Sequence, residues 1–351
     1  MERKREENRI VSLDYIRFLA ITCVILTHVT ERVYTLNVEF LCSVGRVIRW
    51  SGIALFTVGR LGVPLFMFLT GYLMLDRKYT SQDCLKLWKR KILGMLIATE
   101  IWIFIYYIFS LWLNKSMFSF KMLIRQMLFF QGASCPHLWY MGVILGLYIF
   151  IPFVANVLNT SNEKVLIYPI LLAIMYLFVP PVLNAFILSR GGEPLYKQLD
   201  FSFAGGEYGI LLIIGWMIKK GYFTCIKNKY YIVLGVIGYA LTVMSELYAY
   251  KYEISYNVWY NSITLLVASF SIFNLLLKLK KTKIDIFISR LSELSFGVYL
   301  IHYIIVILIF KNIQVNNYLL REVIVLFGSV VISFFISWII SLNKNIAKVL
   351  F

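Results

Sequence analysis

The stretch that decides the fold runs from Ser12 to Tyr34 and reads SLDYIRFLAITCVILTHVTERVY. Its apolar part is about 20 residues long, which is the length that an α-helix needs to cross a bilayer. It nevertheless contains Asp14, Arg17 and His28. Ionisable side chains are costly at membrane depth and usually belong to a functional path. This segment is therefore predicted to be the first membrane span and also part of a site.

The rest of the chain has the same composition. Of its 351 residues, 60% are apolar and 15% are charged, and the mean hydropathy is +0.76. A soluble protein carries about 25% charged residues, so the chain is predicted to be an all-α polytopic membrane protein. The net charge of +17 would suggest nucleic acid as the partner of a soluble protein. In a membrane protein such an excess reflects basic cytoplasmic loops, so no nucleic-acid partner is expected.

Apolar runs of roughly span length predict about ten transmembrane helices. They form a single transmembrane domain over residues 1–351, and no C-terminal soluble domain is expected. Lys and Arg are roughly twice as frequent in loops on the N-terminal side, which predicts that both termini are cytoplasmic. The predicted spans are 12–30, 52–75, 92–112, 138–157, 165–188, 205–218, 230–249, 257–277, 294–310 and 320–342.

The charged residues of the first span have a regular spacing. Ten residues lie between Arg17 and His28, which places both on one face of a helix and about 16 Å apart along its axis. Asp14 lies one turn before Arg17, at a spacing suited to an ion pair. Two interpretations remain open. Arg17 and Asp14 form a structural pair while a neighbouring helix satisfies His28, or the three residues belong to a site.

The chain contains only three histidines, and each lies in or beside a predicted span. His137 stands at the outer start of the fourth span. Ser295, Tyr299 and His302 recur at i, i+4 and i+7 of the ninth, which predicts one polar stripe. Three histidines could bind a metal ion. No metal site is expected, because the three differ in expected depth and have no carboxylate close in sequence.

A further charge, Arg60, lies in the second span within VGRLGVPLFMFLTGYLML. Gly59, Gly62 and Pro64 are predicted to break the helix around it and to free backbone N–H groups that could face an anion beside the guanidinium. The second span is therefore a candidate cavity wall. The alternative is an interfacial arginine at the start of a helix.

Together these motifs resemble the membrane acyltransferase-3 family. Arg17 and His28 match its signature of an arginine and a histidine separated by ten residues, and Leu13–Asp14 precedes them as in many members. GRLGVPLFMFLTGYL resembles the second-span motif of the family, with Arg60 at its basic position. HLWYM and SFGVYLIH resemble later landmarks, and the resemblance extends from about residue 10 to 341. Many members have an acidic residue at the position of Pro64. The proline in this chain resembles the branch that includes the enterobacterial common antigen O-acetyltransferase.

The resemblance implies an O-acetyltransferase of the bacterial cytoplasmic membrane. Such a protein moves an acetyl or other acyl group from cytoplasmic acetyl-CoA to a hydroxyl of an extracytoplasmic glycan or lipid-linked saccharide. Acetyl-CoA is then a co-substrate, no cofactor is bound permanently, and the other partners are the acceptor and membrane lipids. The rival class is a small-solute transporter or flippase, which would explain Arg17 and Arg60. A transporter has no need of three histidines or of the HLWY landmark.

Roles follow for the candidate residues. Arg17, with Lys86, Lys89 and Lys91, is expected to hold the nucleotide phosphates of the donor, because the pantetheine arm is about as long as the separation from Arg17 to His28. His28 is the expected general base, or alternatively the acyl-accepting nucleophile. His137 and Tyr299 are expected to orient the acceptor or the base, and Arg60 is expected to bind an anionic group. The residues expected to support the site are Asp14, Tyr299, Ser295 and His302.

Overall fold

The computed structural model describes residues 10–160, 163–196, 198–254 and 259–351, and within these ranges the regular structure is helical. The helices are α2 (Val11–Tyr34), α3 (Val38–Ser43), α4 (Arg46–Arg60), α5 (Gly62–Met74), α6 (Ser81–Lys86), a π-helical segment (Leu87–Ile92), α7 (Leu93–Asn114), α8 (Phe120–Met127), a 3-10 turn (Pro136–Leu138), α9 (Trp139–Thr160), α10 (Glu163–Leu188), a second 3-10 turn (Ser202–Ala204), α11 (Gly206–Lys219), α12 (Asn228–Lys251), α13 (Ile263–Leu277), α14 (Asp285–Asn312), α15 (Tyr318–Leu342) and α16 (Lys344–Leu350).

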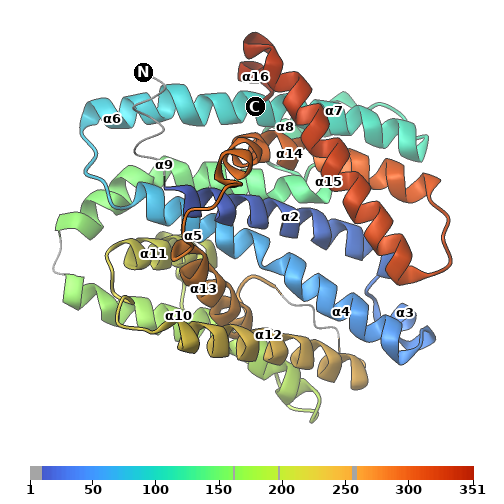
Figure 1. Ribbon diagram of the computed structural model, residues 1–351, viewed down its shortest axis with the longest axis horizontal. Helices are drawn as coiled ribbons and strands as arrows, with labels where there is room; N and C mark the ends of the chain where they lie inside the picture. The colour runs from blue at the N-terminus through green and yellow to red at the C-terminus, as the bar shows by residue number, and fades with distance from the viewer. Residues whose placement is uncertain (1–9, 161–162, 197, 255–258) are drawn as a thin grey trace.

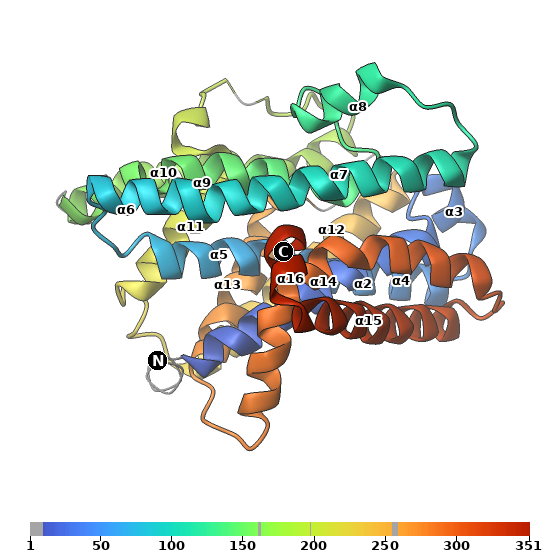
Figure 2. The same cartoon turned by 90° about the horizontal axis from the view of Figure 1, so that it is seen from above.

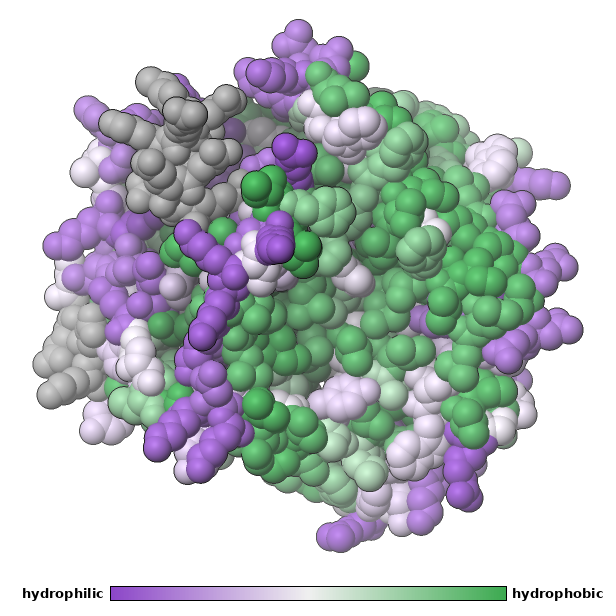
Figure 3. Space-filling view, in the orientation of Figure 1, coloured by the Kyte–Doolittle hydropathy of each residue, from purple (hydrophilic) through white to green (hydrophobic). Residues whose placement is uncertain are grey.

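The long helices form a bundle. Among the described residues, eight helical segments are long and apolar enough to cross a membrane, and Figures 1 and 2 show most of the long helices running along one common direction. The space-filling view has hydrophobic side chains over much of its middle and right, with hydrophilic side chains mostly around the margins (Figure 3). The prediction of an all-α polytopic membrane protein is confirmed.

Two of the predicted spans form helices that are shorter than a span. The run 205–218 forms α11, with 14 residues, and the run 257–277 forms α13, with 15 residues from Ile263; residues 257 and 258 lie outside the described residues. At 1.5 Å per residue these helices are about 21 to 23 Å long, against a hydrocarbon core of about 30 Å. Both pack inside the bundle, α11 on α5 and α13 on α12. Irregular backbone before a short helix is tolerated at membrane depth because protein covers it.

The second span is nearly continuous, in contrast to the predicted break. Only Leu61 separates α4 from α5, its backbone is helical (φ −65°, ψ −24°), and its carbonyl accepts a hydrogen bond from the Leu65 N–H at 3.1 Å. The glycines serve a different purpose. A Cβ on Gly59 would lie 2.7 Å from the backbone nitrogen of Thr27, and one on Gly62 would lie 2.7 Å from the carbonyl oxygen of Ala20. The absent side chains therefore let this span approach α2, which brings Arg60 close to the first helix.

The first helix is central to the bundle. α2 contacts α4, α5, α13, α14 and α15, and many of its apolar side chains are buried, including Ile16, Ile21 and Ile25. α14 lies along α2, so the face of α2 that carries the predicted site residues is turned towards α14. This packing decides what surrounds Arg17 and His28.

Candidate active site

The three histidines meet in the centre of the bundle. The ring centroids of His28 and His302 are 5.4 Å apart, those of His28 and His137 are 6.2 Å apart, and those of His137 and His302 are 5.1 Å apart. The expectation that they differ in depth was wrong. The rings of His28 and His302 stack on each other from two packed helices, and the turn before α9 places His137 beside both.

The histidine cluster contains polar atoms without partners. Both ring nitrogens of His137 and Nε2 of His302 are buried and have no hydrogen-bond partner, whereas Nδ1 of His302 donates to the Tyr299 carbonyl at 2.6 Å. Buried polar atoms are nearly always hydrogen-bonded, so three unpaired nitrogens in one cluster mark this part of the bundle as a candidate site. Among the described residues, no group of three or more His, Cys, Asp or Glu side chains could hold a metal ion.

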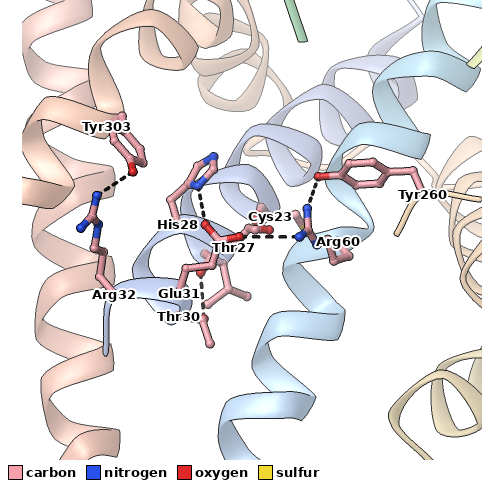
Figure 4. Close-up of polar contacts among 10 residues, drawn as sticks. Cys23, Thr27, His28, Thr30, Glu31, Arg32, Arg60, Tyr260 and Tyr303 are labelled. Atoms are coloured by element: carbon pink, nitrogen blue, oxygen red, sulfur yellow. Dashed lines mark hydrogen bonds and ion pairs between the residues drawn. The ribbon is translucent and has the colours of Figure 1, made fainter. Parts of the chain in front are cut away.

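Glu31 is a site residue that the sequence reasoning missed. Its Oε2 is 2.9 Å from Nδ1 of His28, and its Oε1 is 3.6 Å from Nη2 of Arg60. Figure 4 shows His28 and Arg60 approaching this carboxylate from α2 and α4. A proton on Nδ1 that is donated to Glu31 leaves Nε2 of His28 as the basic nitrogen. The i,i+3 spacing of His28 and Glu31 was the signal in the sequence.

Arg60 has partners within the chain. Besides Glu31, its Nη1 donates to the Tyr260 hydroxyl at 2.9 Å. Its guanidinium carbon lies 4.5 Å from the ring centroid of Phe56, 4.9 Å from that of Trp259 and 5.1 Å from that of Tyr260. Aromatic faces attract a cation, so this cage and the carboxylate hold Arg60 in place. Arg60 was predicted to bind an anion. In the structure the anion beside its guanidinium is the carboxylate of Glu31.

A second pair that was not predicted braces the histidines from the opposite side. Nη2 of Arg32 donates to the Tyr303 hydroxyl at 2.7 Å (Figure 4). The Tyr303 ring lies 5.1 Å from that of His28 and 5.0 Å from that of His137, centroid to centroid. Tyr303 therefore packs against both imidazoles, and Arg32 fixes its position.

Arg17 makes the predicted contact with Asp14 and also faces a cavity. Its Nη1 donates to Asp14 Oδ1 at 3.3 Å and to Ser292 Oγ at 2.7 Å. Ser289 and Ser292 in turn donate to the Asp14 carboxylate. Because Arg17 contacts Ser292 of α14 and His28 contacts His302 of the same helix, the predicted shared face of α2 is confirmed. Arg17 is both a member of a polar network and a wall of the large cavity described next.

The large cavity has a volume of about 1150 Å³ and a basic lining. Lys86 and Lys91, expected at the donor site, line it, whereas Lys89 is not part of its wall. Burial raises the pKa of the Tyr79 hydroxyl in this wall, so the side chain stays neutral. Asp83 is the one acidic residue among the described residues of the lining. The basic residues of the lining are Arg17, Arg77, Lys78, Lys86, Arg90, Lys91 and Lys348.

A small cavity of about 20 Å³ lies between the basic cavity and the histidines. His28 and His137 line it, and it shares Phe66, Tyr140 and Tyr299 with the large cavity. The Tyr299 hydroxyl donates to the His137 carbonyl, which holds this ring at the constriction. The predicted polar stripe of α14 follows the same path, because Ser295 lines the basic cavity, Tyr299 lines both cavities and His302 belongs to the histidine cluster.

Comparison with known proteins adds the family. A family model described as an acyltransferase domain matches residues 10–342. The chain belongs to the acyltransferase-3 family. No curated protein matches it, and no solved structure does.

This membrane acyltransferase has a site suited to group transfer between two molecules. A carboxylate orients the imidazole of His28, and the small cavity beside it has room for about one water molecule. A hydroxyl or a carbonyl group fits such a space, whereas a larger molecule does not.

Proposed function

We propose that this acyltransferase is an O-acetyltransferase that uses cytoplasmic acetyl-CoA and acetylates a hydroxyl of a glycan or lipid-linked saccharide across the bacterial cytoplasmic membrane. The observation that carries the proposal is the basic cavity, which narrows to His28 through a constriction of three aromatic side chains. A solute carrier would need a passage for the whole solute. The small cavity supports the passage of a reacting group only.

The basic cavity suits the shape and charge of the donor. Acetyl-CoA has a large anionic nucleotide end and a thin pantetheine arm. Arginine and lysine side chains such as Arg17, Arg90 and Lys91 would hold the phosphates. The arm then extends about 16 Å along α2, between Phe66, Tyr140 and Tyr299, and brings the thioester carbonyl to His28.

The chemistry at His28 is general-base catalysis. The acceptor hydroxyl oxygen attacks the thioester carbonyl while Nε2 of His28 takes the hydroxyl proton. Glu31 stabilises the imidazolium that forms. A nitrogen of His137 that carries a proton donates to the developing oxyanion. The C–S bond then breaks, the acetyl group stays on the acceptor oxygen, and the proton passes from His28 to the sulfur of departing CoA.

Membrane vesicles of known sidedness test the proposal. With radiolabelled acetyl-CoA outside, inside-out vesicles are expected to incorporate label into the alkali-labile saccharide fraction, and right-side-out vesicles are expected to incorporate little. Vesicles without the chain are the control. Label that enters the lumen as a small molecule, with none bound to saccharide, would instead establish a transporter. Incorporation only by right-side-out vesicles would overturn the cytoplasmic donor site.

Arg17→Lys is expected to raise the apparent KM for acetyl-CoA about tenfold while the acceptor KM stays within about twofold. Lysine keeps the charge but loses the planar, two-pronged hydrogen bonding of the guanidinium to a phosphate. Initial rates at varied acetyl-CoA measure the effect. The matched control is Arg290→Lys, since Arg290 is exposed on α14 and is not part of the cavity wall.

The structural role of Arg17 gives a different result. The side chain also contacts Asp14 and Ser292, so a purely structural arginine would leave the KM for acetyl-CoA unchanged and lower the thermal stability of the protein. Neutralising its partner as well, in Arg17→Lys with Asp14→Asn, would then restore stability. That combination of results would contradict donor binding by Arg17.

A further inference from the structure

Four aromatic side chains gather beside the histidines, away from the basic cavity. This aromatic cluster consists of Trp139, Tyr208, Trp259 and Tyr260. The Trp139 ring stacks on Tyr260 at 5.6 Å and lies 5.7 Å from Trp259 and 5.6 Å from Tyr208, centroid to centroid. The rings come from three separate parts of the chain, namely the start of α9, the start of α11 and the residues just before α13.

The position of the aromatic cluster follows from where three helices begin. α9 begins at Trp139, α11 at Gly206 and α13 at Ile263, and the ring contacts of Trp139 with Tyr208 and Tyr260 bring these starts together beside His137. The guanidinium of Arg60 lies against Trp259 and Tyr260. A belt of Trp and Tyr at a membrane interface faces headgroups, whereas Trp259 and Tyr260 lie against the arginine that contacts Glu31.

The helices order the parts of the site along one direction. On α2, Arg17 lines the basic cavity and His28 lines the small one. On the second span, Phe66 lines the basic cavity, and so does Arg77 just after the span ends. Arg60 lies at the other end of α5, at the aromatic cluster. The histidines therefore stand between the basic cavity and the aromatic cluster.

The small cavity joins the aromatic cluster to His28. Trp139 and Tyr260 line it together with His28 and His137. Its volume of about 20 Å³ accommodates a hydroxyl but no sugar ring, because a single water already needs roughly 10–15 Å³. An acceptor that offers a hydroxyl to His28 from this side must keep its ring against the aromatic cluster. Trp259 does not line the small cavity, but it is next to Tyr260 and is 40% exposed, so it has a surface that a ligand can cover.

We propose that the aromatic cluster is the acceptor subsite, and that it binds the pyranose ring of a saccharide with one hydroxyl directed into the small cavity. This inference rests on the proposed acetyltransferase function. The C–H groups on the face of a pyranose carry partial positive charge and are apolar, which matches the negative face and the apolar area of an indole or phenol ring. The ring hydroxyls remain at its edge, within reach of polar groups such as the Tyr208 hydroxyl.

Kinetics of Trp259 variants test the subsite. The full-length protein in detergent micelles, where both faces are accessible, receives radiolabelled acetyl-CoA and increasing amounts of saccharide, prepared by mild alkaline treatment of envelopes from cells that lack the chain. Trp259→Ala is expected to raise the apparent KM for saccharide about tenfold, because one aromatic stacking contact is lost. The KM for acetyl-CoA should stay within about twofold, and Trp259→Phe should recover most of the saccharide affinity. Trp112→Ala is the matched control, since Trp112 is exposed on α7.

The outcomes separate the subsite from the function on which it rests. If wild type transfers label and Trp259→Ala keeps the wild-type KM for saccharide, the subsite is overturned and the acetyltransferase stands. A loss of kcat alone, with both KM values unchanged, would assign Trp259 to holding Arg60 and would also overturn the subsite. If wild type transfers no label to saccharide, both proposals fail.

Discussion

His28→Ala is expected to lower acyl transfer by about 10² to 10⁴ while the protein remains in the membrane at its normal level. The expected size is that of removing a positioned general base. The imidazole of His28 lies between the basic cavity and the aromatic cluster, and its Nδ1 is held by Glu31 at 2.9 Å. Transfer of radiolabelled acetyl by equal amounts of membrane protein measures the effect.

A substitution elsewhere on the same helix controls for damage to α2. The Thr22 hydroxyl bonds to the carbonyl of Phe18 within the helix, and Thr22 lines neither the basic cavity nor the small one. Thr22→Ala should therefore transfer acetyl within about twofold of wild type. Normal transfer by a well-expressed His28→Ala protein would remove His28 from the mechanism and leave the basic cavity without a catalytic partner.

Glu31→Gln is expected to have the second large effect. Its kcat should fall by a factor of about 10² to 10³, while the KM for acetyl-CoA should stay within about twofold of wild type. The carboxylate accepts a proton from Nδ1 of His28, which leaves Nε2 as the base. A glutamine amide can donate to Nδ1 instead and so favour the tautomer whose Nε2 carries the proton and cannot accept another. The comparison variant is Glu39→Gln, because Glu39 is exposed on α3.

A double substitution shows whether Glu31 acts through His28. Residues that work as one unit are strongly non-additive in their effects on rate. Glu31→Gln in a His28→Ala background should therefore cause little further loss of activity. An additional loss as large as in the wild-type background would mean that Glu31 acts independently, for example by holding Arg60 at 3.6 Å.

The sequence by itself determined the fold class and the local geometry of the first span. The apolar runs of span length and the low share of charged residues predict a helical membrane protein. The relation of Asp14, Arg17 and His28 was also predictable, because residues on one helix are placed by the 3.6-residue period alone. The pair of His28 with Glu31 obeys the same rule, but the predicted span ended at residue 30, so Glu31 fell outside it.

Only the tertiary structure decided how the parts of the site meet. Which residues of different helices share a depth depends on how each helix is shifted and rotated against its neighbours, and the period of one helix holds no such information. His137 and His302 reach His28 because α14 packs along α2 and a short turn precedes α9. Gly59 brings Arg60 to Glu31 by close contact with Thr27, a role that a sequence cannot distinguish from a helix break. The aromatic cluster likewise exists only because the starts of α9, α11 and α13 come together.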